Sequence, residues 1–339
     1  MAEVSVIVPV YNKEKYIGAL LEELLGQTFA DIEIICVDNN STDSSAGIVE
    51  KYAAGDSRIR LIAEGKQGVS AARNAGIKAA GGRYVIFTDA DDEVETDYVK
   101  TLYDRIEGSG ADMAACGYTT FYESQPVKTS PKEERPLLYA NEAIERLFKC
   151  KYYEGYLWNK ILKLDIIREK GLWFDEDISR NEDRLFLVRY LLNAESLAFV
   201  YSHQYCYHLR DDAATAGLVR DVYRVSEEEL TEFDAFERMV ELLQGRSSVN
   251  EEYRDAYEAC VHDMILSELR TFRRMVSLIH GLEYARSHMR HFARQCRKYS
   301  YEPTDATEAK LYRVYRRYGL TGLSCTWDPM QFEYVGRLE

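Results

Sequence analysis

Three carboxylates stand close together at the end of one apolar run. Asp89, Asp91 and Asp92 directly follow Tyr84–Thr88, a run typical of a strand buried on both faces. In open α/β sheets, ligands bind at the carboxyl ends of parallel strands. Clustered carboxylate oxygens at such a place suit Mg²⁺ or Mn²⁺ better than zinc. Taken alone, the cluster fits equally well an Asp-rich turn that caps a following helix.

Polar side chains also end the first two apolar runs, VSVIVPV and IEIICV. Tyr11 follows the first run, and a tyrosine ring at that place can stack on a nucleobase. Asp38 and Asn39 follow the second run, where a side-chain oxygen can accept a hydrogen bond from a base N–H or a ribose hydroxyl. The alternative is a capping turn, in which Ser41 and Asp43 begin the next helix.

A basic residue and an acidic pair lie farther along the chain. Arg73 follows a glycine-bearing loop, EGKQG, whose spacing matches neither a Walker A loop nor G-x-G-x-x-G. Its guanidinium can reach a phosphate or form a salt bridge on its own helix. Glu182 and Asp183 open a helical pattern, and acids suit the positive N-terminus of a helix. A carboxylate held there can also serve as a general base.

Alternating strand and helix patterns must position these residues. Strand patterns cover 4–10, 32–37, 59–63 and 84–88, and helix patterns cover 15–27, 41–54 and 69–80. Repeated β-α units of this kind predict an α/β fold, a Rossmann-like, mainly parallel central sheet with helices on both faces. Beyond residue 97 the pattern is mixed, with strands expected over 113–117, 118–122, 197–201 and 204–209 and helices over 141–149 and 182–192.

The last third of the sequence reads as helical. Helix patterns cover 223–243, 251–276, 281–299 and 306–318, which divides the chain into residues 1–215 and a helical extension over 216–339. Residues 221–269 hold fourteen acids against four arginines, whereas residues 270–317 hold twelve basic residues against four acids. These helices either pair with one another or present a basic surface to anionic lipid headgroups or a charged partner.

Composition narrows the class of protein. The 339 residues carry a formal net charge of −14, which argues against sequence-independent binding of nucleic acid. No apolar run reaches the roughly eighteen residues that a membrane-spanning helix needs, and the N-terminus lacks the pattern of a secretory signal. Seven dispersed cysteines without C-x-x-C spacing indicate reduced thiols. We therefore expect a cytoplasmic protein.

Six segments, in this order, resemble the family 2 inverting glycosyltransferases of the GT-A fold. They are SVIVPVYNKEKYI, QTFADIEIICVDNNSTDSS, GVSAARNAGIKAAGGRY, FTDADD, LWNK and FDEDISRNEDRLF. The resemblance covers roughly residues 3 to 210, and no motif of the helical extension contributes to it. Each segment alone is a weak signal, but their common order makes the resemblance specific.

The resemblance implies a role for each matching residue. Pro9, Tyr11, Asp38, Asn39, Arg73 and Asp89 would bind the donor nucleotide, Asp91 the metal ion, Asp183 would be the general base, and Trp158, Lys160 and Glu182 would line the acceptor side. Asp89 would face the ribose and Asp92 would support the metal-binding pair. The implied cofactor is Mn²⁺ or Mg²⁺, which stabilises charge on the leaving diphosphate as a Lewis acid. The general base would act from the opposite face of the sugar, giving inversion.

One position departs from the family pattern. The commoner motif after the second strand is Asp-Asp-Gly-Ser, whereas this chain has Asp38-Asn39-Asn40-Ser41. Where the family often places a carboxylate that accepts the uracil N–H, the Asn39 amide can either accept or donate. We still expect a UDP-sugar donor.

The expected activity is inverting transfer of a sugar from a nucleoside-diphosphate donor to an acceptor hydroxyl in cell-surface polysaccharide synthesis. The acceptor would be a saccharide or lipid-linked, and the basic helices would permit peripheral membrane contact. The alternative is a catalytically silent sugar-nucleotide binding module, although both Asp91 and Asp183 are present. A nicotinamide-dependent oxidoreductase would need a glycine fingerprint after the first strand, and a nucleotidyltransferase a glycine- and arginine-rich loop. Neither feature occurs there.

Overall fold

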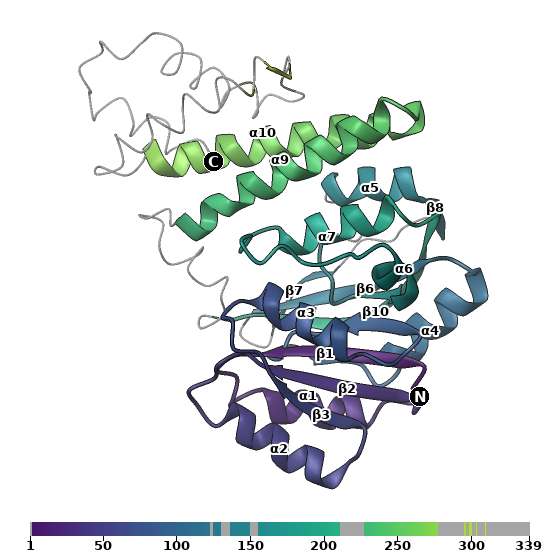
Figure 1. Cartoon of the computed structure of the whole chain (residues 1–339), viewed down its shortest axis with the longest axis vertical. Coiled ribbons are helices and arrows are strands. Elements are labelled where there is room, and N and C mark those ends of the chain that lie inside the picture. Colours follow the sequence, from purple (N-terminus) through teal and green to yellow (C-terminus); the bar gives the residue numbers. More distant parts are fainter. Residues whose placement is uncertain are drawn as a thin grey trace.

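A computed structural model describes residues 2–122, 125–129, 136–149, 155–210 and 227–276, with five isolated residues beyond them (Figure 1). The strands are β1 (Val4–Val10), β2 (Ile32–Asp38), β3 (Ile59–Ala63), β4 (Tyr84–Phe87), β5 (Glu93–Val94), β6 (Met113–Tyr122), β7 (Gln125–Thr129), β8 (Leu137–Tyr139), β9 (Lys160–Lys163) and β10 (Ser196–Leu209). The helices are α1 (Ile17–Leu25), α2 (Ser45–Gly55), α3 (Val69–Ala79), α4 (Tyr98–Ser109), α5 (Ala140–Phe148), α6 (Leu164–Glu169), α7 (Glu182–Leu191), α9 (Glu227–Ser247) and α10 (Arg254–Val276), with a 3-10 turn at Glu251–Tyr253.

One central sheet organises the chain, in the strand order β3-β2-β1-β4-β9-β6-β10-β5, with β7 beside β6 and β8 beside β10. Strands β1 to β4 pair in parallel, as their continuous apolar runs predict. The α/β fold expected from the sequence is therefore confirmed. Because parallel strands end at the same edge, the loops after β1, β2 and β4 gather there.

The second half of the sheet differs from the expectation, most clearly at β9 and β10. Strand β9 lies antiparallel between β4 and β6, although the sequence suggested no strand over its four residues. The expected strands 197–201 and 204–209 form the single strand β10, whose register shifts between Val200 and Tyr205. A bulge of this kind interrupts the apolar alternation without ending the strand pairing. In the sequence it therefore looks like a gap between two separate strands.

Helices cover both faces of the sheet, as expected. Helices α1, α2 and α4 pack on one face, and α3, α5 and α7 pack on the other. Figure 1 shows α9 and α10 stacked beyond α5 and α7, on the side away from α1 and α2. Phe236 of α9 and Ile265 of α10 belong to the same buried cluster as Ile7 and Phe87 of the sheet. The two helices thus complete the main core rather than build a second one.

Several expectations for the extension lie outside the described residues. These are the boundary at residue 215, most of the helices expected over 281–299 and 306–318, and most of the basic segment 270–317. Within the described part of the chain, no helix is both long and apolar enough to cross a membrane.

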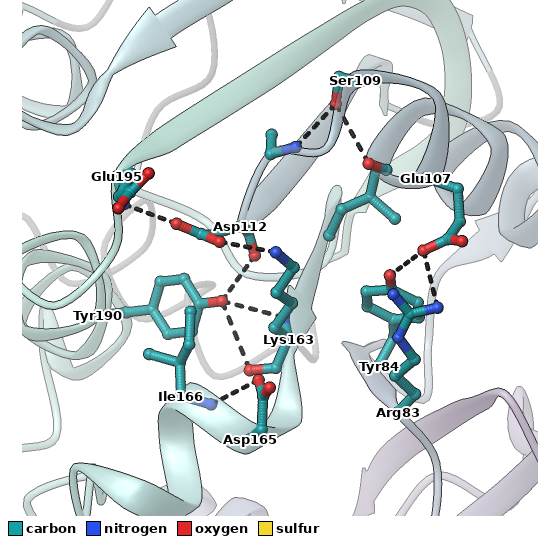
Figure 2. A network of polar contacts seen from close by, with 12 residues as sticks. Arg83, Tyr84, Glu107, Ser109, Asp112, Lys163, Asp165, Ile166, Tyr190 and Glu195 are labelled. Carbon is teal, nitrogen blue, oxygen red and sulfur yellow. Dashed lines mark hydrogen bonds and ion pairs between the residues drawn. The ribbon is translucent and has the colours of Figure 1, made fainter.

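Helix α7 begins with acidic residues and β4 is followed by them, and hydrogen bonds hold the opposite end of each element in place (Figure 2). Tyr190, near the end of α7, donates its hydroxyl proton to the carbonyl oxygen of Asp112 at 2.7 Å and accepts the N–H of Lys163 at 2.9 Å. At the start of β4, the Tyr84 hydroxyl contacts the Glu107 carboxylate. These contacts fix α7 and β4 along their axes, so the acids at their opposite ends have defined positions.

Candidate functional site

The carboxyl edge of the parallel strands brings together the residues expected to bind a nucleotide. The β1–β2 register pairs Val10 with Asp38, so Tyr11 lies next to the start of the loop after β2. The Tyr11 side chain is 48% exposed, while Pro9 and Asp38 are half-buried. One Asp38 carboxylate oxygen, Oδ1, is buried without a hydrogen-bond partner among the described residues. A ligand N–H at this point would remove the cost of that unsatisfied acceptor.

Asn39 is used differently from the expectation. Its side chain is only 3% exposed, and its amide nitrogen donates to the carbonyl oxygens of Glu64 and Lys66 at 3.1 and 2.7 Å. Its amide oxygen accepts the N–H of Gly68 at 2.7 Å. The amide therefore holds the glycine-bearing loop before α3. Of the two residues considered for the nucleobase, Asp38 rather than Asn39 offers a free buried acceptor.

The loops after β1 and β2 are linked through polar backbone contacts. The N–H of Asn12 donates to the Ser41 hydroxyl at 3.1 Å, and the Asn12 amide oxygen accepts the N–H of Thr42 at 2.8 Å. Helix α2 begins only at Ser45, so the prediction that Ser41 caps it is corrected. Asn12 and Asn40 have φ angles of 51° and 64°, a left-handed conformation that asparagine tolerates better than most residues.

Both outer aspartates after β4 already face a cation from the same chain. The Lys13 ammonium lies 2.6 Å from Asp91 Oδ2, and the Arg73 guanidinium lies 3.6 Å from Asp89 Oδ1. Burial raises the pKa of Asp89, and Arg73 opposes that shift while the Asp91 carboxylate adds to it. The effect of Asp91 on Asp89 shows that the two carboxylates lie close together.

Asp92 supports this pair from beneath. Its two carboxylate oxygens accept the N–H of His208 and the hydroxyl of Tyr205, each at 2.8 Å. Burial, together with the Asp89 and Asp91 carboxylates, raises the pKa of Asp92 well above its ordinary value. The Asp92 side chain is thus buried and does not face the ligand. This agrees with the supporting position expected for it from the sequence.

Two of the three residues expected on the acceptor side, Trp158 and Lys160, are instead buried. The Trp158 indole is 4% exposed and stacks on the Tyr205 ring with a centroid distance of 4.4 Å. The Lys160 side chain is fully buried, and its ammonium donates to Asn159 Oδ1 at 2.7 Å and to the Tyr156 carbonyl. Neither side chain can touch an acceptor in this structure, so that prediction is corrected. Trp158 packs on Tyr205, whose hydroxyl donates to the Asp92 carboxylate.

The start of α7 brings a second pair of acids to the same edge. One terminal guanidinium nitrogen of Arg73 donates to Glu182 Oε1 at 2.8 Å, and the other terminal nitrogen faces Asp89. Burial and the neighbouring Asp183 carboxylate raise the pKa of Glu182 to about 7, with Arg73 opposing the shift. Asp183 also raises the pKa of Asp89, so the acids of β4 and α7 lie near one another. The buried Arg73 bridge replaces the surface salt bridge considered from the sequence.

The Asp183 carboxylate has a defined orientation. Its Oδ1 accepts the N–H of Arg184 at 2.7 Å, and the residue is half-buried. Asn181, immediately before α7, has a φ of 60°. This left-handed residue turns the chain sharply into the helix, so that the first-turn acids approach the β4 loop.

Sequence reasoning missed Lys13, Tyr205 and Arg210. Arg210 donates from Nε to the carbonyl oxygen of Asp91 at 2.9 Å, and its guanidinium lies 4.0 Å from the centroid of the Tyr16 ring. Lys13 stands within the YNKEKY segment, but nothing in residue type or spacing distinguishes it from its exposed neighbour Lys15. Only the approach of the β1 and β4 loops identifies it.

The residues present fit a divalent cation that arrives with a phosphate ligand. Among the described residues, no three metal-ligating side chains form a ready cage. Mg²⁺ and related ions at phosphate sites commonly use only one or two carboxylates and take further oxygens from the substrate. Asp91, which already attracts a cation, fits that donor set, and Asp89 lies beside it.

Comparisons with known proteins identify a family and a fold that this chain resembles. Residues 5–169 match the family model described as Glycosyl transferase family 2. The chain is 34% identical over 223 residues to the uncharacterized glycosyltransferase EpsJ of Bacillus subtilis, and the match covers 62% of each chain. It is 35% identical over 218 residues to the putative glycosyltransferase EpsH of the same bacterium, covering 61% of this chain and 60% of EpsH. Both matches span less than two thirds of the relative.

Two solved structures share the fold. Staphylococcus aureus TarS 1-349 in complex with UDP-GlcNAc is 24% identical, with a TM-score of 0.59 over 93% of this chain and 92% of that chain. The mannosyltransferase PcManGT from Pyrobaculum calidifontis in complex with GDP-Man and Mn²⁺ is 15% identical, with a TM-score of 0.54 over 94% and 81%.

Proposed function

Because the chain belongs to glycosyltransferase family 2 and has a GT-A fold, we propose that it catalyses inverting sugar transfer from a nucleoside-diphosphate donor to an acceptor hydroxyl. One observation carries the proposal. The acids after β4 and those opening α7 converge on the buried Arg73, which contacts both Asp89 and Glu182. The donor-binding edge and the general base would then face the same space.

The donor nucleotide would lie over the carboxyl ends of β1, β2 and β4. Tyr11 would stack on the base, and the unpartnered Asp38 Oδ1 would accept a base N–H. Asp89 would accept from a ribose hydroxyl. A uracil base is favoured because TarS, which shares the fold, binds UDP-GlcNAc and UDP.

Asp91, with Asp89 beside it, would hold Mn²⁺ or Mg²⁺. When bound, such an ion neutralises negative charge on the leaving diphosphate as a Lewis acid. The PcManGT complex with Mn²⁺ supports this proposal at the level of the fold.

Asp183 would act as the general base. As the acceptor oxygen forms its bond to the anomeric carbon, the bond from that carbon to the diphosphate oxygen breaks, and the acceptor proton passes to the Asp183 carboxylate. Attack from the side opposite to the leaving group inverts the anomeric centre. The Arg184 N–H fixes one carboxylate oxygen, and such positioning is a main source of general-base efficiency.

The acceptor is proposed to be a saccharide or lipid-linked saccharide of a cell-surface polymer, assembled at the cytoplasmic side of the membrane. Among the relatives is a poly(ribitol-phosphate) beta-glucosyltransferase of Bacillus spizizenii, 28% identical over 214 residues. Relatives with this kind of acceptor favour a polyhydroxyl polymer over a small metabolite.

The decisive test compares Asp183→Asn with Asp165→Asn. Both aspartates open a helix, and each accepts the N–H of the next residue at 2.7 Å, but Asp165 is exposed on α6, away from the site. We expect Asp183→Asn to bind UDP with Mn²⁺ normally and to lose about two to four orders of magnitude in transfer rate. Asp165→Asn should keep wild-type activity.

Other results of the same assays would contradict the proposal. A thermal-shift screen of nucleoside diphosphates with and without Mn²⁺ identifies the base, and stronger stabilisation by GDP or CDP would overturn the uracil assignment. If the wild type binds UDP-sugars but transfers none to a panel of saccharide acceptors or to water, the chain is the silent binding module instead.

A further inference from the structure

Lys13 links the loop after β1 to the metal-binding position after β4. Its backbone N–H donates to the Ser45 hydroxyl at 2.7 Å, which fixes the loop against the start of α2. Its ammonium lies 2.6 Å from Asp91 Oδ2, and the two side chains are 19% and 13% exposed. The pair is thus largely shielded from water, where an ion pair is screened less than at the surface.

Both outer aspartates of the site face a cation before any ligand arrives. Arg73 faces Asp89, Lys13 faces Asp91, and Arg210 adds a third cation at the Asp91 carbonyl. A divalent cation placed on Asp91 beside the ammonium would meet strong like-charge repulsion. The diphosphate of a nucleotide would remove that conflict, because its oxygens can bind both the metal ion and the ammonium.

We propose that Lys13 is the resident counter-ion of Asp91, which excludes a divalent cation from the nucleotide-free protein and contacts the diphosphate once the nucleotide binds. The inference rests on the proposed function and deepens it, because it sets the order of binding. Metal and nucleotide then bind together, and the protein holds no tight metal ion between turnovers. Such an arrangement couples product release to loss of the metal ion.

The experiment measures Mn²⁺ binding to the whole chain by the loss of the free-ion electron paramagnetic resonance signal. For the wild type we expect weak Mn²⁺ binding alone and at least about tenfold tighter binding with saturating UDP. Lys13→Met should bind Mn²⁺ alone about tenfold more tightly than the wild type. Its affinity for UDP without metal should fall about three- to tenfold, because a charge-assisted contact is lost.

Matched variants separate the gain in Mn²⁺ affinity from a general loss of positive charge and from misfolding. Lys13→Arg should exclude Mn²⁺ as the wild type does, and Lys13→Gln should repeat the gain seen with Met. Lys51→Met removes the same charge from the exposed face of α2 and should change neither affinity. A gain in metal binding is a readout that misfolding does not produce.

The outcomes distinguish this proposal from the proposed function. If the wild type binds Mn²⁺ with UDP, but Lys13→Met and Lys13→Gln bind Mn²⁺ alone no better than the wild type, the counter-ion role is wrong while the glycosyltransferase proposal stands. If the wild type binds Mn²⁺ equally well with and without UDP, Lys13 excludes nothing. If it binds no Mn²⁺ even with UDP, the metal site and the role of Lys13 both fail.

Discussion

At the scale of single residues, Arg73 is the connection between the two halves of the site. Its side chain is 8% exposed and lies between Glu182 and Asp89, with its guanidinium 5.4 Å from the centroid of the Phe174 ring. A buried guanidinium with two carboxylate partners has few alternative positions. It therefore sets how the first turn of α7 meets the β4 loop.

Glu182 makes the stability of the protein depend on pH. Its pKa is raised to about 7, above the ordinary range for glutamate, so folding favours the protonated form. The unfolded chain ionises first as pH rises, and the stabilisation present below pH 4.5 is lost progressively up to about 7. The stability of the wild type relative to Glu182→Gln should therefore fall by about 1–3 kcal/mol between pH 5 and 8. Urea denaturation without nucleotide measures this difference.

Glu176→Gln is the control for that measurement. Lys66 and Asn74 lower the pKa of Glu176 by hydrogen bonding to its carboxylate, so the residue stays ionised throughout this pH range. The stability difference between the wild type and this variant should be constant from pH 5 to 8. A constant difference for Glu182→Gln as well would mean that Glu182 is also ionised throughout.

At the scale of elements, α3 lies unusually close to β1. A Cβ atom added at Gly76 would lie 2.4 Å from Cγ2 of Ile7, closer than any relaxed contact. The glycine lets α3 approach the sheet, and this approach places Arg73, one turn earlier, beside the acids. The position of the helix thus depends on a missing side chain.

Gly76→Ala should destabilise the protein by about 1–3 kcal/mol, because the added methyl group overpacks the helix–sheet contact. Gly47→Ala, in the first turns of α2, adds a Cβ that meets nothing within 4 Å. This control should be neutral or stabilising by up to about 1 kcal/mol, because alanine favours the helix. Midpoints of thermal unfolding compare the two, and equal effects would show that α3 can shift without cost.

At the scale of the whole molecule, α9 and α10 are part of the same core as the central sheet. Arg238 of α9 forms ion pairs with Asp175 and Asp177, and Arg184 of α7 pairs with Asp263 of α10 at 2.6 Å. The same elements share one buried cluster. The described helices of the extension therefore stabilise the segment that carries Asp183.

Met239→Ala should test this shared core. Met239 of α9 is fully buried, so its truncation should cost about 2–5 kcal/mol. Tryptophan fluorescence, to which Trp158 beneath the site contributes, and helical circular dichroism should shift together. Leu242→Ala, at a side chain 37% exposed on the same helix, should cost less than about 1 kcal/mol. A shift confined to the helical signal would show that the extension unfolds separately.

The parallel half of the sheet and the site at its edge were predictable from the sequence. The β-branched runs of β1, β2 and β4 specify buried strands, and parallel pairing places the residues after each run at one edge. The position of Asp183 in the first turn of α7 also follows from its local pattern. Each of these predictions depends on a short segment, in which the pattern of apolar residues and the residues at its ends are visible in the sequence.

Only the tertiary structure decided how the polar groups pair. Lys13 meets Asp91 across 78 residues of chain, and Arg73 meets Glu182 across 109. Residue type suggested that Asn39 faces a nucleobase and that Lys160 faces an acceptor, yet the first holds a loop and the second is buried. Local sequence determines which groups reach an edge of the sheet. Which of them then pair depends on the approach of loops, a bulge in β10 and a glycine under α3, and these depend on packing over the whole molecule.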